Sequence, residues 1–182
     1  MEQVTPNPEV GGSAAGTFHL TESEDGWLLT MERRVGTNCE GLWECLTEPS
    51  QLARWAPFTA NRPLTEAGPV RLAAAHVEES DARAGSVIQA EAPRHLVFDW
   101  GPDTLRWMLE PDQGGTRLTL QHRFSERGQA PAYAAGWQLC LKGLVELGEG
   151  GHPPVMVGER ALEYGWMDWY VWYARHWHME PF

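Results

Sequence analysis

Residues 95–124 read HLVFDWGPDTLRWMLEPDQGGTRLTLQHRF, three runs in which apolar and polar side chains alternate. A period of two is typical of a β-strand with one buried face. Residues 101–103 and 112–115, between the runs, are rich in turn-forming Gly, Pro, Asp and Gln. The stretch therefore predicts a sequential antiparallel meander. Its strands cover residues 95–101, 104–110 and 116–124, with Leu96, Phe98, Trp100, Leu105, Trp107, Leu109, Thr116, Leu118, Leu120, His122 and Phe124 on the buried faces.

The hydrophobic period changes directly after this meander. Residues 131–147 read PAYAAGWQLCLKGLVEL, and their apolar side chains recur every three or four positions. That spacing predicts one long helix with an apolar face, ended by Gly148. The face consists of Tyr133, Trp137, Cys140, Leu141, Leu144 and Leu147.

The segments before the meander are shorter. Residues 27–35 alternate like a half-buried strand. Thr37 and Glu40 have the spacing of a capping box, which predicts a short helix, and Pro49 suits the first turn of a second one. Residues 70–75 and 86–90 are weaker strand candidates whose register the sequence leaves open.

A last helical stretch is expected over residues 158–177. Leu162, Trp166, Trp169, Tyr170, Tyr173 and Trp177 would share one face, whereas Tyr164 and Trp172 would lie off it. Leaving several aromatic side chains in water is unfavourable, and a two-fold partner would cover them. We therefore predict a homodimer through this C-terminal helix.

Strands and helices are segregated along the chain, which favours an α+β fold with a helix against one face of the sheet. We expect a flexible tail over residues 1–16, one domain over residues 17–151 and a helical extension over residues 152–182.

Four stretches also resemble one family in the same order. LWECLTEPSQLARW at 42–55 resembles its VW-x-ALTDPE-x-L-x-x-W signature, and APRHLVFDW at 92–100 its PPR-x-L-x-x-x-W strand. GTRLTLQH at 115–122 and AGWQLCLKGL at 135–144 resemble its next strand and its long helix. The family comprises bacterial relatives of the activator of the ninety-kilodalton heat-shock chaperone ATPase, within the START-like (SRPBCC) superfamily.

This resemblance covers about residues 27–150 and implies a helix-grip fold, in which a curved antiparallel sheet wraps a long C-terminal helix and leaves a cavity. Two short helices would follow the first strand, and the C-terminal helix would be an addition. The chain departs from the family pattern at Gln138, where His is usual, and at Lys142-Gly143, where Asp is usual. Because the superfamily includes ligand carriers, cyclases, hydrolases and co-chaperone domains, fold leaves function open.

Composition excludes several classes of function. Asp and Glu outnumber Lys and Arg by 25 to 14, so the basic surface that nucleic acid or an anionic membrane needs is missing. Cys39, Cys45 and Cys140 form no CxxC pair, and no metal motif or Gly-rich phosphate loop occurs. We therefore expect a cytoplasmic protein without metal or cofactor.

Ten tryptophans are unusual for 182 residues and suggest an aromatic cavity. The sheet and the long helix would converge on it, and an apolar cavity with a few polar groups is typical of a small-molecule site. A filled core is the alternative. The predicted ligand-binding residues are Trp55, Phe58, Phe98, Trp100, Trp107, Leu109, Leu118, Leu120, His122, Trp137 and Leu141.

His122 is the sharpest polar candidate, because it lies on an apolar strand face. It could orient a ligand or act as an acid or base near neutral pH, or it could be a satisfied core histidine. Binding of a small apolar or aromatic ligand is the first hypothesis. The second is a cyclase- or hydrolase-like enzyme that uses His122 with Arg62 or Asp99, and the third, from the resemblance alone, is contact with a chaperone.

Overall fold

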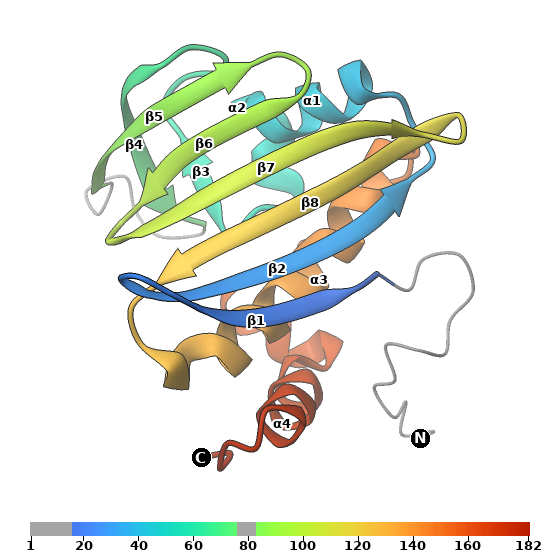
Figure 1. Cartoon of the computed structure of the whole chain (residues 1–182). Helices are drawn as coiled ribbons and strands as arrows, with labels where there is room; N and C mark the ends of the chain where they lie inside the picture. The colour runs from blue at the N-terminus through green and yellow to red at the C-terminus, as the bar shows by residue number, and fades with distance from the viewer. Residues whose placement is uncertain (1–15, 76–82) are drawn as a thin grey trace.

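The computed structural model describes residues 16–75 and 83–182 as one α+β body built on an eight-stranded antiparallel sheet (Figure 1). The strand order is β1-β2-β8-β7-β6-β5-β4-β3, and the sheet curls around the long helix α3, Ala130–Gly148. The helix-grip architecture predicted from the sequence is confirmed. The strands are β1 Phe18–Ser23, β2 Gly26–Val35, β3 Phe58–Ala60, β4 Gly68–Ala74, β5 Arg83–Glu91, β6 His95–Trp100, β7 Asp103–Asp112 and β8 Gly115–Phe124.

The meander β6-β7-β8 has the predicted buried faces. Leu105 pairs with His122, Trp107 with Leu120, and Leu109 with Leu118, so the inward side chains form adjacent rows. All six are at most 1 % exposed. The alternation of apolar and polar side chains was enough to predict these faces, because only one face of the strands packs on α3.

The two short helices are α1, Cys39–Thr47, and α2, Pro49–Trp55. The cap of α1 differs from the expected capping box: Asn38 is the N-cap, and its side chain accepts a hydrogen bond from the Gly41 backbone N–H at 2.9 Å. Asn is as good an N-cap as Thr, so the helix starts one residue later than predicted.

The C-terminal segment differs from the single helix that we expected. A 3-10 helix, η4, covers Gly158–Tyr164, and the α-helix α4 begins only at Trp166 and ends at His176. Gly165 separates them with a φ of 86°, a left-handed conformation that glycine adopts without strain. The predicted apolar stripe is therefore split, and Leu162 is 57 % exposed.

Strand β1 was not predicted, and it changes the surroundings of α4. Its Phe18 ring packs edge-on against Trp172 and Tyr173, at centroid distances of 5.6 and 5.1 Å. Trp172 is therefore partly covered within the chain. The expected tail over residues 1–16 falls, apart from Gly16, outside the described residues. Within the described part of the chain, no helix is both long and apolar enough to span a membrane.

Candidate functional site

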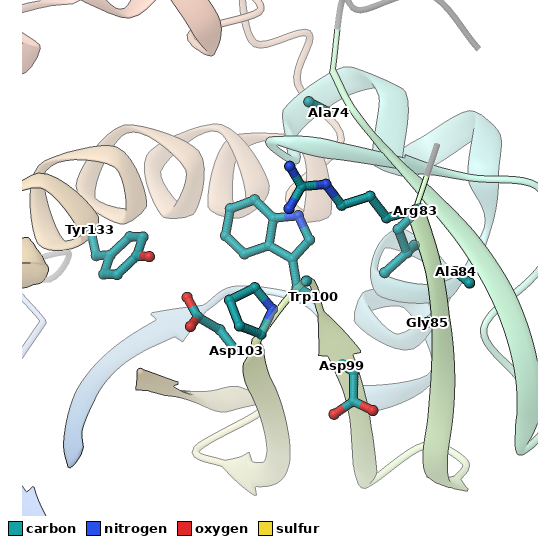
Figure 2. A pocket seen from close by; sticks show the side chains of 11 residues that line it. Ala74, Arg83, Ala84, Gly85, Asp99, Trp100, Asp103 and Tyr133 are labelled. Atoms are coloured by element: carbon teal, nitrogen blue, oxygen red, sulfur yellow. The ribbon is translucent and has the colours of Figure 1, made fainter. Parts of the chain in front are cut away.

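A cavity of about 540 Å³ opens where the β6–β7 turn, strands β4 and β5, and the first turn of α3 meet (Figure 2). Trp100, the last residue of β6, pairs across the turn with Asp103, the first residue of β7. Tyr133 of α3 faces them, and its hydroxyl points toward the Asp103 carboxylate in Figure 2. Arg83 also lines the wall, and Asp99 lines it with its carboxylate pointing away from Trp100 in Figure 2. The cavity therefore combines two aromatic rings with the charged side chains of Asp103 and Arg83.

A buried chain of hydrogen bonds lies behind this wall. The His122 imidazole is fully buried, and its Nε2 lies 2.8 Å from Oδ2 of Asp103. On the other side of the ring, the indole Nε1–H of Trp137 donates to Nδ1 of His122 at 3.0 Å. The ring of Tyr133 covers the imidazole at a centroid distance of 4.2 Å. Helix α3 thus holds His122 through two aromatic side chains one turn apart.

This geometry fixes the protonation of His122. An indole N–H can only donate, so Nδ1 must accept and carries no proton. Nε2 then carries the single ring proton and donates a hydrogen bond to Oδ2 of Asp103, so His122 is a neutral imidazole. Burial lowers the pKa of His122 and outweighs the opposing effect of the Asp103 carboxylate. The short contact between His122 and Asp103 is therefore a hydrogen bond of a neutral donor to a carboxylate, and it is not an ion pair.

The Asp103 carboxylate also affects Tyr133. Burial and the neighbouring carboxylate raise the pKa of Tyr133, in that order of importance, so its phenol stays protonated and can donate. The Asp103 side chain is only 8 % exposed. The cavity therefore presents a nearly buried carboxylate whose neighbours His122 and Tyr133 are both neutral.

A second, smaller cavity of about 200 Å³ shares Trp100 and Tyr133 with the first. It lies between α3 and the C-terminal segment, and Met156, Val157 and Ala161 form part of its wall. Trp100 and Tyr133 thus stand between a polar cavity and an apolar one. The remaining lining residues are Pro57, Ala132, Gly136, Trp137, Cys140, Gly158 and Trp166.

The residues predicted to bind a ligand divide into two groups. Trp100 and Trp137 line these cavities. The others pack between sheet and helix in the core; for example, Trp55 stacks edge-on against Trp107 at 5.6 Å. A ligand role for this core group stays a prediction. Its members are Trp55, Phe58, Phe98, Trp107, Leu109, Leu118, Leu120, His122 and Leu141.

The polar residues named beside His122 lie in different places. Arg62 donates to the carbonyl oxygens of Pro63, Glu66, Gly68 and Pro69, and so it holds its own loop. Asp99 does line the large cavity and accepts a hydrogen bond from Thr104 at 3.2 Å.

Sequence reasoning missed three charged or aromatic residues of the large cavity, Arg83, Asp103 and Tyr133. Asp103 was taken only as a turn residue after Gly-Pro, and Tyr133 only as part of the apolar helix face. Asp103 lies two residues before Leu105, on the inward face of the same strand, and that period could have placed it inside.

In residues 16–75 and 83–182, no group of three or more His, Cys, Asp or Glu side chains is arranged to hold a metal ion. Cys39, Cys45 and Cys140 are free and buried. Burial raises the pKa of Cys140 to about 12, so its thiol is inert at neutral pH although it borders the smaller cavity.

A sheet wrapped around a long helix, with cavities at the end of that helix, defines a START-like helix-grip domain. The family model described as "Activator of Hsp90 ATPase homolog 1-like protein" matches residues 36–149, and the chain belongs to this family. The C-terminal segment with η4 and α4 lies beyond the matched residues.

Solved structures show the same fold at low sequence identity. A conserved protein of unknown function, EF2215 from Enterococcus faecalis, is 16 % identical with a TM-score of 0.67, covering 91 % of this chain and 93 % of that one. The solution structure of CalU16 from Micromonospora echinospora is 18 % identical with a TM-score of 0.67, covering 92 % and 95 %. No curated protein matches the chain.

Proposed function

We propose that this protein binds a small molecule with an apolar or aromatic part in the cavity beside Trp100 and Tyr133. The observation that carries the proposal is the cavity of about 540 Å³, whose wall combines aromatic rings with a few fixed polar groups. Small-molecule sites typically have volumes of about 300–1,000 Å³ and this mixture of side chains. The smaller apolar cavity behind the same two rings could take the apolar end of a longer ligand.

An enzyme that uses His122 directly is less well supported. Both ring nitrogens already have partners within the protein, and the imidazole is fully buried. A general base must come within hydrogen-bond reach of its substrate. In this arrangement His122 orients Asp103, and Asp103 and Tyr133 are the groups that reach the cavity.

The C-terminal segment, which lies outside the residues matched by the family model, would also take part in ligand binding. Met156, Val157 and Ala161 close one side of the smaller cavity, and they come after the last matched residue, 149. The length and apolar character of the ligand would then depend on this segment.

The homodimer, the chaperone contact and the cytoplasmic location remain proposals. For the dimer, Leu162 and Met167 are 57 % and 44 % exposed on the C-terminal segment and could be covered by a second copy. Trp172, which first suggested the dimer, is instead partly covered by Phe18. The chaperone contact rests on the family description alone.

Filling the cavity tests the proposed binding. Ala74 lines the cavity at an exposed position of β4, so Ala74→Trp should fill it without disturbing the core. Ala73→Trp is the matched control, because successive side chains of a strand point to opposite faces. The neutral probe N-phenyl-1-naphthylamine should gain emission on binding the wild type and the control, and lose at least about tenfold in affinity for Ala74→Trp. Equal binding to all three, or no binding to the wild type, would contradict the proposal.

A further inference from the structure

The Asp103 carboxylate is the feature of the cavity that the fold alone does not explain. Its side chain is 92 % buried, and its contact to His122 comes from a neutral imidazole. Among residues 16–75 and 83–182, no Lys or Arg nitrogen lies within 4.0 Å of it. Burying a charge without a counter-charge is unfavourable. The negative charge of Asp103 is therefore held at a cavity wall with a hydrogen bond from His122 but without a cation.

We infer that the ligand carries a positive charge, as a protonated or quaternary amine, placed between Asp103 and the rings of Trp100 and Tyr133. This inference rests on the proposed binding function and names the class of ligand. The faces of aromatic rings attract organic cations, most strongly when the site is shielded from water. Figure 2 shows Trp100 and Tyr133 flanking the side of the cavity where Asp103 lies. A carboxylate beside two such rings suits an ammonium group attached to an apolar body.

Arg83 and Asp99 are the other charged residues of this wall, but the Asp99 carboxylate points away from Trp100 in Figure 2. Arg83 is an exposed residue of β5, so its guanidinium keeps its hydration without a ligand. The buried Asp103 carboxylate has little hydration, so an opposite charge stabilises it more than it stabilises Arg83. The net charge of the chain, −11, also attracts cations. The buried carboxylate and the acidic chain therefore favour a cation over an anion.

Three probes of similar size separate charge from shape. They are benzyltrimethylammonium, its neutral isostere neopentylbenzene, and benzenesulfonate, titrated at low salt against the tryptophan emission of the full chain. We expect the ammonium ion to bind the wild type at least about tenfold more tightly than the neutral isostere. This comparison needs no variant, so it stays decisive even where a substitution harms folding.

Asp103→Asn should then reduce ammonium affinity about tenfold and leave the neutral probe unchanged. Asp112→Asn is the matched control: it removes the same charge from the far end of β7, where Asp112 pairs with surface arginines. Equal affinity of all probes for the wild type would overturn the cationic ligand and leave the cavity proposal intact. Tighter binding of benzenesulfonate would overturn the cationic ligand and would indicate an anionic ligand held by Arg83. Failure of every probe, the neutral one included, would contradict both proposals.

Discussion

The buried imidazole of His122 makes the stability of the fold depend on pH in a defined direction. Trp137 donates to Nδ1 and Nε2 donates to Asp103, so a second proton would place two N–H groups against each other. Burial also lowers the pKa of His122, because the charged form would lose its hydration. The folded state therefore keeps this residue neutral at a pH where the unfolded chain is already protonated.

The sign follows from proton linkage. Below the pKa of about 6.5 that an unfolded histidine has, the unfolded chain binds more protons than the folded one. The stabilising contribution of neutral His122 is complete above about pH 6.5, and it decreases as the pH falls toward the lowered folded value. The slope is at most about 1.4 kcal/mol per pH unit. Between pH 7.5 and 5.5 the loss should therefore approach about 1 kcal/mol.

Urea unfolding of the wild type and of His122→Gln at several pH values measures this effect. Glutamine keeps a polar side chain and does not titrate, so the difference between the two proteins isolates His122. The variant should be less stable by about 1–3 kcal/mol at pH 7.5, because the ring contacts to Tyr133 and Phe124 are lost. The gap should narrow as the pH falls. If the free energies of unfolding of the two proteins change in parallel with pH, the lowered pKa of His122 is refuted. If their difference widens toward pH 5.5, His122 is charged and paired with Asp103.

Three further predictions concern α3 and α4. Tyr173→Phe should cost about 1 kcal/mol in urea unfolding, because the hydroxyl donates to Gln138 Oε1 at 3.0 Å; an unchanged midpoint would show that this bond adds nothing. Gly143→Ala should stabilise by up to about 1 kcal/mol, since a Cβ there meets Met156 and Trp55 at an ordinary 3.6 Å; a loss of stability would reveal crowding between α3 and its neighbours. Light scattering at micromolar concentration should show a dimer that Met167→Glu dissociates; a monomeric wild type would refute the dimer, and a dimeric variant would place the interface away from Met167.

Elements with a strong hydrophobic period could be predicted closely. The strands of the meander and helix α3 agree with the structure within a few residues, since each buries one face over many consecutive positions. Strands β1 and β3 were missed for a physical reason: β3 has three residues, and β1 offers only Phe18 and Leu20 to the body. Such short segments gain their stability from pairing with a neighbour, which a local pattern does not encode.

The site was predictable only in part. Alternation alone placed His122 inside, but it could not show that Trp137 and Asp103 would occupy both ring nitrogens. Those contacts join β7, β8 and α3, and they depend on how the helix is rotated against the sheet. Composition predicted an aromatic cavity, whereas the large aromatic side chains mostly fill the core. The cavities lie instead beside the turn, where the sequence indicated only a change of direction.

Two buried charges in this chain show how a structural role differs from a binding role. Arg33 is 93 % buried, and its guanidinium donates to Glu32 O and Gln138 Oε1 at 2.7 and 2.8 Å. The hydroxyl of Tyr173 in α4 donates to the same Gln138 oxygen. Gln138 replaces the histidine usual in the family, and a neutral oxygen there accepts from both neighbours. Burial lowers the pKa of Arg33, but a guanidinium does not lose its proton in proteins. Burial raises the pKa of Tyr173 to about 12, so its hydroxyl stays a protonated donor at neutral pH. The fold thus satisfies Arg33 with two neutral oxygens, and Gln138 links it to Tyr173 of α4. Asp103 accepts a hydrogen bond from His122 but faces a cavity, where the proposed cationic ligand would supply the opposite charge.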